Sequence, residues 1–210
     1  MIAIKNLSAS YNNQRILRFP EWHLSQGEFC LMLGPSGSGK STLLHLLAGI
    51  LQPKSGEITI ANAKLFEMSQ AKRDKFRGQN IGLIFQKAHL IDAVSVKDNM
   101  LMAQYFAGEK RDLSRVKEVL EELHIADKLK AKTFQLSQGE AQRLSIARAM
   151  LNKPSVILAD EPTSSLDDDN CETVYNILAT QAQKYDATLL ISTHDQRLKD
   201  KIPRHLKLEK

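Results

Sequence analysis

The sequence has few cysteines and no long apolar stretch. Only two cysteines, Cys30 and Cys171, occur in 210 residues, and each lies in apolar or helical surroundings without a second metal ligand nearby. This pattern argues against a disulfide framework or a zinc site. No run reaches the roughly 18 uninterrupted apolar residues of a membrane span, and the first residues lack a signal-peptide pattern. We therefore expect the protein to lie in a reducing cytoplasm and not to cross a membrane unaided.

The charge balance is moderately basic. There are 29 Lys and Arg against 24 Asp and Glu, a net charge of +5. Such an excess can favour phosphates, anionic lipid headgroups or nucleic acid, or serve solubility alone. A hydrophobic content of 42% is enough to form a core. Because the sequence shows no repeat or linker-like stretch, we expect a single domain over residues 1–210.

Four short apolar segments each end in a polar or glycine-rich position. They are FCLML before Gly34, IGLIF before Gln86, VILA before Asp160 and TLLIST before His194. Continuous apolar runs of this length are typical of strands that are covered on both faces. The pattern predicts a parallel sheet with its chemistry at one edge.

The segments between these strands have helical periodicity. The apolar positions recur at helical spacing in three groups: Leu43, Leu44, Leu47 and Ile50; Val116, Val119, Leu120 and Leu123; Val174, Ile177 and Leu178. Alternating strands and helices predict an α/β fold with a mostly parallel core sheet. The first thirty residues alternate apolar and polar positions, which predicts an N-terminal antiparallel β subdomain. Residues 87–153 are expected to form an inserted helical subdomain, with the core and β subdomain in 1–86 and 154–210.

The segment GPSGSGKST, residues 34–42, follows the first predicted core strand and precedes a leucine-rich helix. It matches G-x-x-x-x-G-K-[ST], in which glycines let backbone N–H groups surround phosphate oxygens beside a helix N-terminus. We expect Lys40 to reach the β- and γ-phosphates and Ser41 to bind Mg²⁺. The other residues expected to complete the cradle are Gly34, Pro35, Ser36, Gly37, Ser38, Gly39 and Thr42. A flexible Gly-Ser turn is the alternative interpretation.

Polar side chains follow the other three core strands. Asp160 is expected to hold Mg²⁺, directly or through water, and Glu161 to orient or deprotonate an attacking water. A cap on the turn before Pro162 is the alternative for this pair. Gln86 can bind Mg²⁺ or water, and a neutral His194 can donate to a γ-phosphate oxygen, although either residue can equally be a capping or turn residue.

The stretch LSQGEAQRLSIARAML, residues 136–151, begins with the capping box Ser137/Glu140 of an amphipathic helix. It also resembles the signature motif of ATP-binding-cassette (ABC) ATPases, most often LSGGQ. The resemblance covers nearly the whole chain in the family's order. Its elements are Tyr11, the loop 34–42, Gln86, the signature, VILADE, SSLD at 164–167 and His194. The resemblance implies a P-loop NTPase fold of ABC type with ATP and Mg²⁺ as cofactors.

The family also implies roles that spacing cannot show. Tyr11 would stack on adenine, and the signature residues Ser137, Gln138, Gly139 and Glu140 would face ATP held by a second subunit, with Asp167 at that interface. The chain would therefore form a head-to-tail dimer with itself or with a homologous ABC subunit. Gln138 stands where Gly is usual and Glu140 where Gln is usual, so we expect tuned rather than absent activity.

The resemblance further implies an integral-membrane permease as partner. Its coupling helix would dock near the segment after Gln86, where Leu90, Ile91, Val94, Met100, Met102 and Phe106 either form an apolar docking surface or pack the subdomain's own core. The phrase LADEPTSSLD and the short chain resemble ATPases of the lipoprotein-releasing, macrolide-exporting and cell-division type. The expected location is cytoplasmic, peripheral on the inner face of the membrane through the permease.

Two alternatives stay open. ABC ATPases of chromosome maintenance, repair or translation use the same site, but the sequence lacks their coiled coils, zinc modules and tandem cassettes, so no nucleic acid is expected. A non-hydrolysing nucleotide-dependent scaffold is the second alternative, and the intact Glu161 and His194 argue against it.

Overall fold

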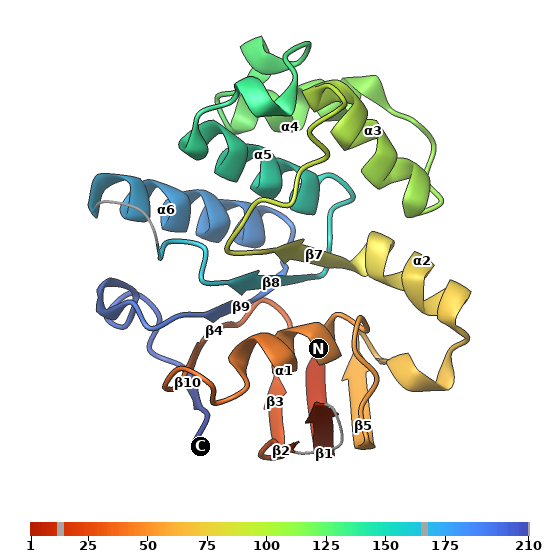
Figure 1. Ribbon diagram of the computed structural model, residues 1–210, viewed down its shortest axis with the longest axis vertical. Helices are drawn as coiled ribbons and strands as arrows, with labels where there is room; N and C mark the ends of the chain where they lie inside the picture. Colours follow the sequence, from red (N-terminus) through yellow and green to blue (C-terminus); the bar gives the residue numbers. More distant parts are fainter. Residues whose placement is uncertain (12–14, 165–167, 210) are drawn as a thin grey trace.

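The computed structural model describes residues 1–11, 15–164 and 168–209, with all but a few of their side chains (Figure 1). The strands form two sheets. The antiparallel sheet joins β1 (Ile2–Tyr11), β2 (Arg15–Arg18), β3 (Trp22–Leu24), β5 (Ser55–Ile60) and β6 (Ala63–Lys64). This sheet confirms the prediction of an antiparallel β layer near the N-terminus.

The second sheet is parallel throughout its described pairs. Its order is β10-β4-β9-β8-β7, formed by β10 (His205–Lys207), β4 (Phe29–Leu33), β9 (Thr188–Ser192), β8 (Val156–Asp160) and β7 (Ile81–Ile84). The four predicted core strands are all present. Met32 and Asp160 both pair with Ser192, so the carboxyl ends of β4, β8 and β9 lie level.

The helices are α1 (Lys40–Leu47), α2 (Gln70–Asn80), α3 (Val96–Phe106), α4 (Leu113–Glu122), α5 (Gln138–Met150) and α6 (Asp168–Lys184). Short 3₁₀ turns are η1 (Leu65–Glu67), η2 (Ala126–Lys128), η3 (Thr133–Gln135) and η4 (Gln196–Leu198). Helix α1 lies between the two sheets, and α5 and α6 cover the opposite face of the parallel sheet (Figure 1). Within the described residues, no helix is long and apolar enough to span a membrane.

The core has two parts, one on each face of the parallel sheet. Buried leucines of α1, such as Leu43 and Leu47, pack with both sheets, whereas α3, α4, α5 and α6 share the other cluster. Two helical predictions need correction. Helix α1 ends at Leu47, so Ile50 lies beyond the helix and is 47% exposed. The polar helix α2 was not predicted, because none of its residues is fully buried.

Residues 87–153 contain α3, α4 and α5, as the periodicity predicts. Helix α5 also packs directly on β7 of the core sheet. The division into a core and an inserted helical subdomain therefore stays a proposal.

Arg115 on α4 connects three helices through a nearly buried side chain. Its guanidinium donates to the backbone oxygens of Met150 and Leu151 at the end of α5, each at 3.2 Å, and to the Tyr185 hydroxyl beyond α6 at 2.7 Å. The Tyr185 ring also lies beneath it, 5.4 Å from the guanidinium carbon. Arg115 thus caps the C-terminus of α5, whose last carbonyls have no helical partner.

Candidate nucleotide site

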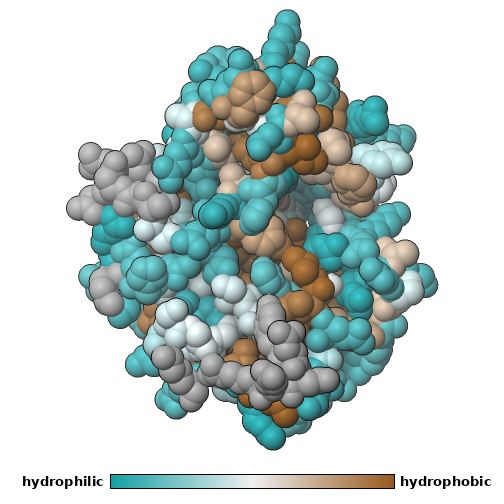
Figure 2. Space-filling model, in the orientation of Figure 1, coloured by the Kyte–Doolittle hydropathy of each residue, from teal (hydrophilic) through white to brown (hydrophobic). Residues whose placement is uncertain are grey.

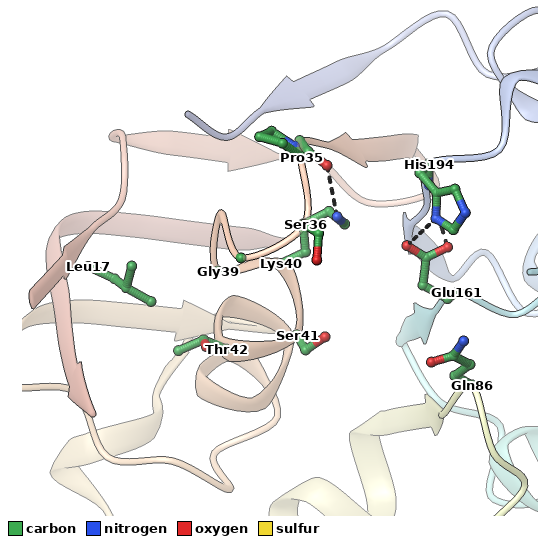
Figure 3. Close-up of a pocket in the computed structure, with 12 residues that line it drawn as sticks. Leu17, Pro35, Ser36, Gly39, Lys40, Ser41, Thr42, Gln86, Glu161 and His194 are labelled. Carbon is green, nitrogen blue, oxygen red and sulfur yellow. Dashed lines mark hydrogen bonds and ion pairs between the residues drawn. The ribbon is translucent and has the colours of Figure 1, made fainter. Parts of the chain in front are cut away.

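The carboxyl ends of the core strands open into one pocket of about 740 Å³ (Figure 3). The loop after β4 forms one wall, and the residues after β7, β8 and β9 form the other. The residues that line it are Leu17, Gly34, Pro35, Ser36, Gly37, Gly39, Lys40, Ser41, Thr42, Gln86, Glu161 and His194. Side chains from distant parts of the sequence thus meet at the predicted edge of the sheet.

Glycine is required at two positions of the phosphate loop. Gly39, the N-cap of α1, has φ +98°, in the region that side chains disfavour. A Cβ at Gly34 would lie 2.5 Å from Ser38 Oγ and 2.7 Å from Leu208 O. Among the described residues, no side chain forms a capping hydrogen bond at the N-terminus of α1. The N–H groups of its first turn and its positive dipole end are therefore available to an anion in the pocket.

Lys40 begins α1 and bends back over the loop. Its Nζ donates to the backbone oxygen of Gly34 at 2.8 Å, which places the cation at the mouth of the cradle. Ser38 behaves differently from the other predicted loop residues, because its side chain is buried and is absent from the pocket lining. Ser38 instead lines a neighbouring hollow of about 520 Å³.

Glu161 and His194 form a direct pair on the wall opposite the phosphate loop (Figure 3). His194 Nδ1 lies 2.9 Å from Glu161 Oε1, and the Glu161 side chain is only 13% exposed. Since a carboxylate oxygen accepts, Nδ1 of His194 carries the proton in this pair and Nε2 stays available. The sequence predicted separate roles for the two residues, and the structure links them by this hydrogen bond.

The backbone of Glu161 is unusual. Its φ is +49°, a left-handed conformation that is uncommon for residues other than glycine. Its N–H donates to Ser192 O at 2.9 Å, and Thr193 Oγ1 donates to its carboxylate at 3.4 Å. Strained backbone of this kind is found where a side chain must be aimed at a site. Here it aims the carboxylate into the pocket.

Asp160 ends β8, next to Glu161 in the sequence, and is not among the residues that line the pocket. Its Oδ1 is buried and has no hydrogen-bond partner among the described residues. A buried, unpaired carboxylate oxygen is costly unless a cation or donor reaches it. Together with the Ser41 hydroxyl this is an oxygen donor set, the kind that Mg²⁺ prefers. The residues present therefore fit the predicted ion.

Gln86 follows β7 at the edge of the pocket. Its Nε2 donates to Ser164 Oγ at 3.0 Å, and Ser164 Oγ donates to the backbone oxygen of Glu161 at 3.1 Å. Gln86 is therefore connected to the turn that follows Glu161. Sequence reasoning missed this link through Ser164, because no local pattern relates the ends of β7 and β8.

The N-terminus of α5 has the predicted capping box. Ser137 Oγ accepts from the Glu140 N–H at 3.3 Å, and Glu140 Oε2 accepts from the Ser137 N–H at 2.8 Å. That backbone hydrogen bond is the main reason why the pKa of Glu140 falls to about 2, and Lys128 Nζ lies 3.2 Å from its other oxygen. None of residues 137–140 is among those that line the pocket.

Within the part of the chain that the structure describes, the position of Gly139 does not require glycine. An added Cβ would meet nothing closer than Arg143 Nη1 at 3.7 Å. Gln138 lines a neighbouring hollow of about 460 Å³ together with Gln86. The side chain of Tyr11, which ends β1, and the whole of Asp167 lie outside the described part of the chain.

One residue that lines the pocket and one that supports it from behind were not predicted. Leu17 on β2 lines the pocket, and the period-two alternation of that strand could have placed it on the inward face. Thr193 is fully buried behind Glu161. Its position after the TLLIS strand was the only available signal.

A second surface region lies between α2, α3 and β7. A hollow of about 320 Å³ includes Ile50, Phe106 and Arg148 in its lining, and apolar side chains gather in the middle of the face seen in Figure 2. Phe106 is 68% exposed and Ile91 43%. Met100 was predicted as a docking candidate but is completely buried, because it faces the core of the helical cluster.

Comparisons with known proteins agree on one family. Residues 17–164 match the family model described as ABC transporter. The lipoprotein-releasing system ATP-binding protein LolD of Buchnera aphidicola is 39% identical over 97% of this chain and 92% of its own length. LolD of Colwellia psychrerythraea is 37% identical over 92% of this chain and 76% of its own length.

Solved structures give the same result. The dimeric ATP-binding cassette MJ0796 in a post-hydrolysis state with ADP and Pi has a TM-score of 0.88 at 30% identity, covering 99% of this chain and 94% of that one. A second dimeric structure of MJ0796, described as a bacterial ABC transporter cassette, has a TM-score of 0.89 at 30% identity, covering 100% and 94%.

Proposed function

Because this chain belongs to the ABC transporter family and is an ATP-binding subunit that hydrolyses ATP, we propose that it drives a lipoprotein-release or related export complex. The observation that carries the proposal is the convergence of the phosphate loop, Gln86, Glu161 and His194 on one pocket. The similarity to LolD proteins over nearly the full chain supports lipoprotein release as the transport step.

In the proposed reaction, water attacks the γ-phosphate of ATP and the bond to ADP breaks. Glu161 accepts the proton from that water, and Lys40 and the amides of the loop hold the phosphate oxygens. His194 stays bonded to Glu161 through Nδ1–H, and in its protonated imidazolium form it would also donate from Nε2–H to a γ-phosphate oxygen. We propose Ser41, Asp160 and Gln86 as the residues that hold Mg²⁺, which when bound neutralises charge on the phosphates.

We propose that two copies close head to tail around ATP. Three observations support this. The signature residues lie outside the pocket of their own chain, an added Cβ at Gly139 would make only an ordinary contact with Arg143 at 3.7 Å, and the similar MJ0796 cassettes are dimeric. Ser137 and Gly139 of one copy would then contact the γ-phosphate held by the other. Tyr11 on the adenine and Asp167 at the interface stay proposals from the family.

The permease partner is proposed to dock at the hollow lined by Ile50 and Phe106. Both side chains are exposed and apolar, and the hollow lies against Arg148, which donates to the backbone oxygens of Ala88 and His89 just after Gln86. A partner seated there would sense the terminal phosphate through this segment. The protein would lie on the inner face of the membrane, held by that permease.

The catalytic assignment is tested with Glu161→Gln. The amide keeps the size of the side chain but cannot take the proton. We expect turnover of Mg-ATP to fall by about 10²-fold or more, while ATP binding persists and closed dimer accumulates on a sizing column. Unchanged phosphate release would remove Glu161 from this role.

The transport assignment is tested by purifying the native complex from detergent-solubilised membranes. A copurifying integral-membrane permease that stimulates phosphate release supports the proposal. Copurification with nucleic acid and a steeply salt-dependent affinity for it would favour the maintenance class of ABC ATPase instead.

A further inference from the structure

Asp195, the residue after His194, is the centre of a nearly buried cluster that the proposed reaction does not use. Its side chain is 9% exposed. Its carboxylate accepts from Thr163 Oγ1 at 3.2 Å and Cys171 Sγ at 3.5 Å, and Arg197 Nη2 donates to it at 2.7 Å. Hydrogen bonds from Arg197, with smaller help from Thr163, lower the pKa of Asp195 to about 2. These hydrogen bonds hold the Asp195 carboxylate in one orientation.

The partners of Asp195 come from two other parts of the chain. Thr163 is completely buried, two residues after Glu161. Cys171 is 2% exposed in the early part of α6, and burial raises the pKa of its thiol, so the thiol keeps the proton that it donates. Asp195 therefore joins the loop after β9 to the turn after β8 and to α6.

The backbone of Asp195 makes a second connection to the same carboxylate. Its N–H donates to Thr193 Oγ1 at 2.9 Å, and Thr193 Oγ1 in turn donates to Glu161 Oε2 at 3.4 Å. Thr193 and Asp195, the residues on either side of His194, are thus both connected to Glu161 by hydrogen bonds, Asp195 through Thr193. Glu161 needs such support because its φ of +49° is intrinsically unfavourable.

We infer that Asp195 is a positioning residue for ATP hydrolysis, which bonds Thr163 and so holds His194 and Glu161 within hydrogen-bond distance. This inference rests on the proposed ATPase site. Asp195 itself does not line the pocket, so its effect on catalysis passes through the two residues that do. Its described hydrogen bonds go to Thr163, Cys171, Thr193 and Arg197 and not to the phosphate loop, so ATP binding should be largely independent of it.

The expected signature is a loss in kcat with little change in KM. A displacement of a reacting group by about 1 Å can cost on the order of 10² in rate. We expect Asp195→Ala and Thr163→Val each to lower kcat for Mg-ATP by about 10- to 100-fold, with KM changed by less than about two-fold. Thr163→Ser keeps the hydroxyl and should restore most of the rate.

Glu172→Ala is a matched control. Glu172 lies next to Cys171 in the sequence and is paired with Lys201 at 2.6 Å, but its side chain is 63% exposed and Asp195 is not its partner in this ion pair. Its rate should equal that of the wild type. Thermal unfolding of each variant identifies any that fail to fold, and the comparison of Thr163→Val with Thr163→Ser then carries the test.

Crystal structures of the wild type and Thr163→Val give a measurement that needs no activity. We expect the Nδ1–Oε1 separation of His194 and Glu161 to exceed about 3.5 Å in the variant, beyond hydrogen-bond reach. An unchanged separation, or equal kcat for Thr163→Val and Thr163→Ser, would overturn the inference. A wild type without turnover would instead refute the proposed ATPase, and the structures would still decide the role of Asp195.

Discussion

Replacement of Arg115 by alanine should destabilise the protein far more than a surface substitution. The side chain is 8% exposed and carries three hydrogen bonds, to the backbone oxygens of Met150 and Leu151 and to the Tyr185 hydroxyl. It also forms an ion pair with Glu118 at 3.0 Å. Alanine would leave the C-terminal carbonyls of α5 without their donor.

The size of the loss follows from these contacts. A hydrogen bond from a charged donor contributes about 1.5–3 kcal/mol, and such terms are not additive within one side chain. Removing one partner of a buried ionic interaction lowers the free energy of unfolding by about 3–5 kcal/mol in total. For a chain of this length each kcal/mol corresponds to roughly 2–4 °C. Arg115→Ala should therefore lower Tm by roughly 6–20 °C.

Urea unfolding and calorimetry measure this loss. Arg111→Ala is the control, because Arg111 is exposed and its described aromatic contact is with Tyr105, at 5.8 Å. That variant should lose at most about 1 kcal/mol. Arg115→Lys should fall between the two, since it keeps the charge and loses the planar fork. If Arg115→Ala and Arg111→Ala unfold alike, the proposed connection of α4, α5 and α6 is wrong.

Three further predictions concern the phosphate-binding elements. Lys40→Ala should weaken ATP binding by roughly 10- to 150-fold, the equivalent of one charge-assisted interaction. Equilibrium titration with ATP measures this loss, and the exposed Lys54→Ala is the control. An ATP affinity equal to that of the wild type in Lys40→Ala would count against the phosphate cradle. Gly39→Ala should cost about 1–2 kcal/mol of unfolding free energy because alanine disfavours φ +98°, and it should also weaken ATP binding; urea curves that match the wild type would contradict this. The pKa of Glu140 is lowered from 4.5 to about 2, so its stabilisation is present above pH 4.5 and is lost as the pH falls toward 2. The stability advantage of the wild type over Glu140→Gln should shrink across that window, and a constant difference would refute the assignment.

Local sequence patterns determined much of this protein. Continuous apolar runs predicted the four strands that carry the pocket, because strands covered on both faces need apolar residues at every position. The phosphate loop and the Ser137/Glu140 capping box were also predictable, since each is made within a few consecutive residues. Helix α2 was missed for the opposite reason, because a helix without a buried face has no apolar period.

Tertiary structure alone decided how the pocket residues meet one another. Three hydrogen bonds join residues that lie more than thirty positions apart in the sequence: Glu161 with His194, Gln86 with Ser164, and Thr163 with Asp195. Their separation is set by the order and register of parallel strands, and no spacing along the chain encodes it. The sequence supplied the chemical groups at each strand end, and the folding of those strands side by side turned the groups into one site.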